Sequence, residues 1–146
     1  MKTALLDVNL LIALLWPAHE HHQAAHRWFD AWGSTQWATC PLTELGFVRI
    51  VANPAFSRDA LEPEGALVLL QQNLEHPGHA FWADYLSVRD AVGAPQARLR
   101  GARQVTDAYL LGLAHEHGGV LATLDTGLRE TASRDQLPAL EIVKPR

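Results

Sequence analysis

The sequence predicts an α/β fold in which a central, mainly parallel sheet of about four to five strands is covered by helices on both faces. Short apolar runs typical of buried strands alternate along the chain with segments of helical periodicity. Two of these runs lie far apart and both lead into an acid: residues 4–6 before Asp7, and residues 120–123 shortly before Asp125. Ligands of open α/β sheets bind beyond the carboxyl ends of the strands, so we expect both acids to face one crevice.

The N-terminal half of the sequence is predicted to form two strands and four helices. Proline and glycine lie at most of the expected helix ends. Pro17 ends the first helix, because the residue before a proline is pushed out of the helical conformation. Gly33 ends the second helix, and Pro41 suits the first turn of the third. The expected elements are a strand at 4–6, helices at 10–15 and 18–32, a strand at 36–39, and helices at 42–52 and 63–74.

The C-terminal half continues the alternation of strands and helices. Its strongest helical pattern ends at the pair Gly118 and Gly119, which a helix C-terminus favours. The expected elements are a strand at 79–82, a short helix near 84–92, a loop at 93–101, a helix at 105–117, a strand reaching Thr123, a short helix around 127–132 and a strand at 140–143.

Size and composition indicate one globular domain over residues 1–146. The apolar fraction of 48% and the charged fraction of 19% are typical of a folded protein and not of a disordered chain. A net charge of −4 argues against broad attraction to nucleic acid or to an anionic membrane, although a local basic patch and a bound metal could still hold a nucleic acid. The single cysteine, Cys40, excludes an internal disulfide and a multi-cysteine zinc site.

The N-terminal residues do not predict a signal peptide. Asp7 and Asn9 interrupt the leucine-rich stretch, and no small-residue cleavage site precedes the histidine-rich segment that follows. No run approaches the roughly 18 apolar residues of a membrane-spanning helix. We therefore expect a cytoplasmic protein with no membrane partner.

Two further acids lie on apolar helix faces, where a solvated carboxylate is not expected. By helical spacing, Glu44 shares a face with Phe47 and Val51. Asp107 likewise shares a face with Leu110. Each acid also lies in the first turn of its helix, where the helix dipole favours an anion, so simple capping is an alternative for each alone. Together with the two strand-end aspartates, they predict a cluster of four carboxylates.

Such a cluster indicates a divalent cation, because clustered carboxylates repel one another and a hard cation relieves the repulsion. Mg²⁺ or Mn²⁺ held by a few carboxylates and waters is usual at phosphate chemistry, where it activates a water and stabilises charge on a phosphodiester. Asn9 and Thr123 each lie two positions from an acid and could orient metal-bound water. Plain hydrogen bonding at the strand ends is the alternative for both.

Four segments in register make the chain similar to the PIN-domain ribonucleases, in particular the VapC-type toxins of type II toxin–antitoxin pairs. These segments are Leu5–Asn9, Thr43–Leu45, Arg103–Leu110 and Leu121–Asp125. The resemblance implies a PIN fold, which is a three-layer α/β/α sandwich, and a Mg²⁺- or Mn²⁺-dependent endoribonuclease that hydrolyses RNA phosphodiester bonds. It also implies a homodimer and a VapB-like antitoxin partner. The acids implied as metal ligands and catalytic groups are Asp7, Glu44, Asp107 and Asp125.

The main departure from the family pattern is the long arginine-bearing connection before the third acid. Arg98, Arg100 and Arg103 lie there and, with Arg89, are four of the 12 lysines and arginines in the chain. In an acidic protein this segment is the best candidate for contacts with an RNA phosphate backbone. An ordinary solvated loop is the alternative.

Other functions fit the sequence less well. A PIN-like protein-binding module that has lost catalysis is the main alternative, and the presence of all four acids weighs against it. A haloacid-type phosphatase needs a second aspartate two residues after the first, where this chain has Asn9.

The histidines and tryptophans add two weaker predictions. His22 and His26 lie one helical turn apart and could bind a metal, but a solvated helix face explains them better. Among the five tryptophans, which are more often core or interface residues, Trp16 and Trp82 are the candidates for stacking on bases.

Overall fold

Five short strands form the centre of the fold in the computed structural model, which describes residues 2–32, 36–93 and 99–145. The strands are β1 (Ala4–Leu6), β2 (Trp37–Thr39), β3 (His79–Phe81), β4 (Val120–Thr123) and β5 (Leu140–Ile142). All pairings are parallel and the strand order is β3-β2-β1-β4-β5. The predicted parallel sheet is therefore confirmed, and β1 occupies its middle.

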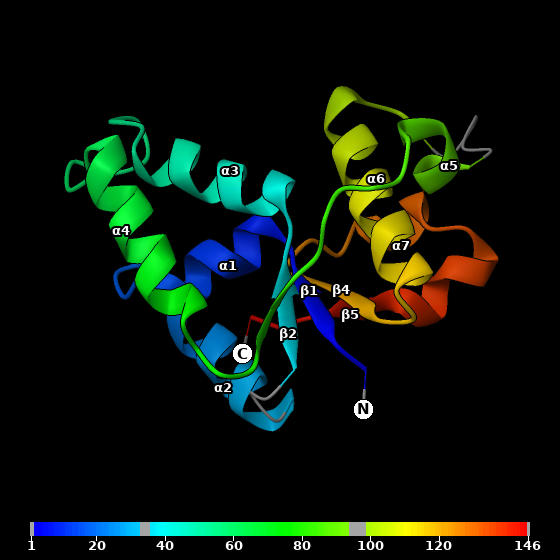
Figure 1. Cartoon of the computed structure of the whole chain (residues 1–146), viewed down its shortest axis with the longest axis horizontal. Coiled ribbons are helices and arrows are strands. Elements are labelled where there is room, and N and C mark those ends of the chain that lie inside the picture. Colours follow the sequence, from blue (N-terminus) through cyan, green and yellow to red (C-terminus); the bar gives the residue numbers. More distant parts are fainter. Residues whose placement is uncertain (1, 33–35, 94–98, 146) are drawn as a thin grey trace.

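Helices cover both faces of this sheet (Figure 1). One face carries α1 (Val8–Leu15), α2 (His22–Trp32), α3 (Pro41–Val51) and α4 (Pro63–Leu74). The other carries α5 (Val88–Val92), α6 (Ala102–Glu116), α7 (Leu128–Thr131) and the 3-10 helix η2 (Arg134–Ala139). The result is the expected three-layer α/β/α arrangement. Among the helices in the described ranges, none has both the length and the apolar character needed to cross a membrane.

The side chains of β1 divide between two cores. Leu5 packs with Ala38 and Leu121 against the α5–α6 layer, whereas Ala4 and Leu6 pack on the opposite face. Successive side chains of a strand point to opposite faces, so a strand covered by helices on both sides is apolar throughout. This explains why β1 has no alternating polar positions.

Several helices begin at positions other than those predicted. The first starts at Val8 and not at residue 10, because the Asp7 carboxylate accepts a hydrogen bond from the Val8 amide over 2.8 Å. The second starts at His22, after turns that follow Pro17. The helix predicted near 84–92 is limited to Val88–Val92, where the Ser87 hydroxyl accepts from the amide of Asp90 over 3.0 Å.

Two elements in the C-terminal half also differ from the prediction. The longest helix begins at Ala102, three residues earlier than expected. The 3-10 helix Arg134–Ala139 was not predicted, although the amide of Ser133 donates to the Gln136 side chain over 3.1 Å, a contact typical of a capping box.

The solvated helix face predicted for His22 and His26 holds for His26, which is exposed, whereas His22 is half-buried. Nδ1 of His22 donates to the Ala13 carbonyl over 2.8 Å, and Nε2 of His26 donates to the Leu14 carbonyl over 3.1 Å. Both carbonyls belong to the last turn of α1, where a helix has no partners of its own for them. The two imidazoles therefore cap the C-terminus of α1 from the neighbouring helix.

Close packing between α5 and α6 depends on Gly112. A Cβ atom added at Gly112 would lie 1.9 Å from the carbonyl oxygen of Ala91, which is far inside van der Waals contact. By contrast, a Cβ added at Gly65 on α4 would meet only the Leu61 Cβ, at 3.6 Å. An added methyl group would therefore clash at Gly112 but fit without a clash at Gly65.

We expect Gly112→Ala to destabilise the fold by about 1–3 kcal/mol or more, because α5 and α6 must separate to admit the methyl group. The matched variant Gly65→Ala should stabilise it by about 0.5–1 kcal/mol, because alanine reduces the conformational entropy of the unfolded chain. Urea unfolding curves measure both. A wild-type midpoint for Gly112→Ala would contradict the close packing described above.

Candidate active site at the carboxyl ends of β1 and β4

Asp7 links the end of β1 to the start of α1. Its amide donates to the Ala122 carbonyl of β4 over 2.9 Å, which continues the parallel ladder to this residue. The side chain is only 6% exposed and caps α1 through the amide of Val8. Burial raises the pKa of Asp7, and hydrogen bonds from Thr123 and Val8 offset that increase only in part. Asp7 is therefore a buried carboxyl group whose ionised form is incompletely compensated.

Thr123 and Asn9 connect this carboxyl group to the end of β4. The Thr123 hydroxyl donates to Asp7 Oδ2 over 2.7 Å and accepts from Asn9 Nδ2 over 3.3 Å. Asn9 Oδ1 in turn accepts from the amide of Leu124 over 3.2 Å. The amide of Asp125 donates to the Thr123 hydroxyl over 3.1 Å. These bonds position Asp7 and fix the backbone that leads to Asp125.

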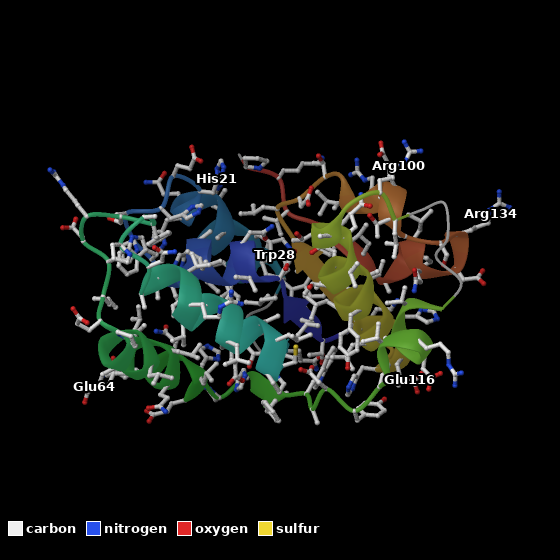
Figure 2. The ribbon with its side chains drawn as sticks, turned by 90° about the horizontal axis from the view of Figure 1, so that it is seen from above. His21, Trp28, Glu64, Arg100, Glu116 and Arg134 are labelled. Atoms are coloured by element: carbon white, nitrogen blue, oxygen red, sulfur yellow. The ribbon has the colours of Figure 1, made fainter. Side chains whose placement is uncertain are left out.

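Asp107 and Asp125 lie in the same cleft as Asp7. The cleft has a volume of about 770 Å³ and opens at the carboxyl edge of the sheet, which Figure 2 views from above. Burial raises the pKa of Asp107 to about 7, and the negative charges of Asp7 and Asp125 add to the increase. Asp125 is exposed, and its Oδ1 accepts from the amide of Gly127 over 2.9 Å. Three of the four predicted acids are therefore brought together.

Glu44, the fourth predicted acid, lies at the neighbouring strand end and does not line this cleft. The Thr39 hydroxyl donates to Glu44 Oε2 over 2.7 Å. Because that hydroxyl has only one proton, His79 Nε2, also 2.7 Å away, must donate to the Thr39 oxygen. The Thr39–His79 pair therefore holds the Glu44 carboxylate beside β2 and β3.

The donor set of the cleft suits a hard divalent cation. Asp7, Asp107 and Asp125 supply oxygen ligands, and within the described residues no basic side chain forms an ion pair with them. In the same part of the chain, no three acidic, histidine or cysteine side chains converge closely enough to form a finished coordination sphere. Mg²⁺ needs only one or two direct carboxylates, because it retains several waters. The uncompensated negative charge and the oxygen donors fit such an ion.

Sequence reasoning missed two nitrogen-bearing side chains of this cleft, Arg49 and His19. Arg49 is one helical turn beyond Gly46 on α3. A Cβ at Gly46 would lie 2.7 Å from Val8 Cγ2, so this glycine lets α3 approach the start of α1 and places Arg49 over the cleft. A glycine inside an otherwise regular helix was the available signal.

The predicted RNA-contact segment is only partly described. Arg98 lies outside the described residues, and so does the side chain of Arg103. Arg100 is exposed and lies at the outer rim of the molecule (Figure 2), while its amide donates to the Gln104 side chain.

Of the two tryptophans singled out for base stacking, Trp82 is buried. Its ring stacks on His117 with centroids 3.9 Å apart, which leaves no free face for a base on that side. Trp16 is half-buried and packs edge-on against Phe56, with ring centroids 5.3 Å apart.

We expect the metal-free protein to lose stability as pH rises from about 4 to about 7. The folded pKa of Asp107, about 7, exceeds its unfolded value of 3.8, so in this window the folded state retains a proton that the unfolded state has released. The associated stability is complete below about pH 4 and is lost as pH rises through the folded pKa.

Urea midpoints measured with chelator from pH 4 to 8 test this expectation. Asp107→Asn has no proton to lose and should flatten the dependence relative to wild type, whereas the exposed Asp30→Asn on α2 should not. Equal slopes for wild type and Asp107→Asn would mean that the pKa of Asp107 is not raised in the folded protein.

Comparison with known proteins gives consistent relatives. Residues 4–134 match the PIN domain family. Ribonuclease VapC39 of Mycobacterium tuberculosis is 43% identical over 131 residues, which cover 90% of this chain and 94% of that protein. Ribonuclease VapC38 of the same organism is 41% identical over 140 residues, covering 96% and 97%. Ribonuclease VapC29, also from this organism, is 44% identical over 126 residues, covering 86% and 88%.

Among solved structures, the fold matches the crystal structure of DNA-bound VapBC from Salmonella typhimurium. The TM-score is 0.59 and both chains are covered completely, at 20% identity. At that identity the match supports the fold alone. The family match and the relatives from M. tuberculosis each extend over most of the chain. The chain therefore belongs to the PIN-domain family and is a VapC-type member of it.

Proposed function

We propose that this protein is a metal-dependent endoribonuclease and the toxin of a toxin–antitoxin pair. The observation that carries the proposal is the cleft at the ends of β1 and β4, which Asp7, Asp107 and Asp125 line together. The relatives named ribonucleases cover most of the chain, which supports RNA as the substrate.

In this proposal Asp7, Asp107 and Asp125 hold Mg²⁺ or Mn²⁺, with Glu44 as the fourth acid. The bound metal supplies an activated water and stabilises charge on the phosphodiester. Thr123 donates to one oxygen of Asp7 and thereby fixes the orientation of that carboxylate. The Thr39 hydroxyl does the same for one oxygen of Glu44.

Two further groups of polar residues belong to the same proposal. Asn9 and Thr123 lie close enough to the aspartates to orient water around the cation. Arg98, Arg100 and Arg103 are the proposed phosphate contacts.

The proposed partners are an RNA substrate, a VapB-like antitoxin and a second copy of the chain. The antitoxin partner is proposed from membership of the VapC-type family, and the Salmonella structure with the same fold is itself of a VapBC assembly.

An exposed apolar patch fits the homodimer. Leu42, Val88 and Val105 line one surface hollow, and Val88 is 59% exposed. Leu45, which is 60% exposed, lies one helical turn beyond Leu42 on α3. Thr106 lines both this hollow and the acidic cleft. A second copy on this patch would therefore flank the candidate active site.

We expect Asp7→Asn to keep the fold and abolish RNA cleavage, because asparagine preserves shape but removes the charge that a cation needs. Excess Mg²⁺ or Mn²⁺ at ten times Kd should stabilise wild type by roughly 1.4 kcal/mol, a melting shift of about 3–6 °C. The variant should show much less of this shift.

Melting curves with chelator and with metal, together with cleavage of a structured RNA, provide the measurement. Equal metal-induced shifts in the two proteins would mean that the acids do not share a cation. A metal-induced shift in wild type without any cleavage would favour the catalytically inactive binding module.

We expect wild type to run as a dimer and Val88→Glu to run as a monomer, because a charge cannot be buried without a partner in the proposed interface. Leu67→Glu on α4 is the control, since Leu67 is similarly exposed but lies outside the patch. Light scattering gives the mass in each case. A dimeric Val88→Glu protein would place the interface elsewhere.

A further inference from the structure

The acidic cleft is lined by residues of a different character besides the three aspartates. These include Arg49 and Ile50 of α3, His19 and Phe56. An adjoining hollow of about 320 Å³ shares His19 and Phe56 with the cleft and is also lined by Trp16. The two hollows therefore adjoin at His19 and Phe56. We call Trp16, His19, Arg49, Ile50 and Phe56 the aromatic arm of the cleft.

Arg49 is the cationic member of the aromatic arm. It is exposed on α3 and forms no ion pair within the described residues, although it lines the same cleft as Asp7, Asp107 and Asp125. A guanidinium offers paired donors that match a phosphate oxygen pair. Since a divalent cation would occupy the three acids, Arg49 remains available for a phosphate.

The aromatic members are held in place by local bonds. Phe56 packs edge-on against Trp16, and its amide donates to the Asn53 carbonyl over 2.9 Å in the turn after α3. The His19 amide donates to the Trp16 carbonyl over 2.9 Å, and the His19 Nδ1 accepts from the amide of His21 over 3.0 Å. The rings therefore form a preorganised corner of half-buried aromatic surface at the end of the cleft.

We propose that the aromatic arm binds the nucleotide of single-stranded RNA next to the scissile phosphate. Arg49 pairs with the phosphate of that nucleotide, and the corner of His19, Phe56 and Trp16 stacks on its base. A guanidinium followed by aromatic rings is the combination that single-stranded nucleic acid requires, because its bases expose their faces for stacking. The inference rests on the proposed function and adds a nucleotide-binding site to it.

RNA is the proposed occupant because the arm and the three acids line the same cleft. Arg49, Ile50, His19 and Phe56 of the arm line the same cleft as the acids that would hold the cation, so a strand with its phosphate at those acids lies in the cleft that the arm lines. Within the described residues, the arm side combines a cation with aromatic rings. An apolar peptide would satisfy the rings but not Arg49.

Fluorescence anisotropy of a labelled single-stranded oligoribonucleotide tests the arm, with all variants made in the otherwise wild-type protein, with Mg²⁺ present and with a phosphorothioate backbone that resists hydrolysis. Arg49→Gln should raise Kd about tenfold or more and reduce the salt slope by about 0.7, the value for one lost phosphate contact. Phe56→Leu should raise Kd about tenfold with the salt slope unchanged, since stacking carries no charge. Arg134→Gln is the control, because Arg134 lines neither hollow and lies at the opposite end of the molecule from Glu64 (Figure 2).

The outcomes separate the arm from the proposed function. If Arg49→Gln and Phe56→Leu bind RNA as tightly as their parent, while wild type cleaves RNA, the arm is overturned and the proposed function stands. If wild type neither binds nor cleaves RNA with Mg²⁺, both are overturned. A loss of Mg²⁺-induced thermal stabilisation on introducing Arg49→Gln alone into wild type would also overturn the arm, because Arg49 would then act on the metal site and not on the nucleotide.

Discussion

The candidate active site depends on one hydrogen bond between the ends of two neighbouring strands, in which the Thr123 hydroxyl donates to the buried carboxyl group of Asp7 over 2.7 Å. A carboxylate at 6% exposure is costly unless it is hydrogen-bonded or paired. Thr123 and the Val8 amide supply part of the compensation, and the start of α1 places a favourable helix dipole there. Because β1 is the middle strand, Asp7 reaches acids from both α6 and the segment after β4.

The sequence was sufficient to predict the sheet and the positions of the strand-end acids. Strands buried on both faces are continuous apolar runs, so an aspartate at the end of such a run is conspicuous. Asp107 was predictable because helical spacing puts it on an apolar helix face, where a carboxylate is equally conspicuous. The direction of Glu44 was not, because its carboxylate orientation depends on Thr39 and on a histidine of β3 that is distant in sequence.

Other features were hidden because they depend on how helices meet. Arg49 reaches the cleft only because Gly46 lets α3 approach Val8, and helical periodicity cannot reveal which neighbour a face will contact. The burial of Trp82 could not be predicted from its residue type, because it depends on packing against His117, which is distant in sequence. The hydrogen bonds of His22 and His26 could not be predicted, because periodicity does not show the unpaired carbonyls of another helix.

The caps on α1 have a mechanical consequence. A helix of eight residues is too short to persist alone in water, so α1 depends on the contacts that fasten it at both ends. Its first turn is fastened by the carboxyl group of Asp7, and its last by two imidazoles from α2. It is therefore a helix about 12 Å long that is held by hydrogen bonds at both ends. A partner that displaced α2 would break the two hydrogen bonds at the C-terminal end of α1. Because α1 begins directly after Asp7, this would also disturb the position of the acid.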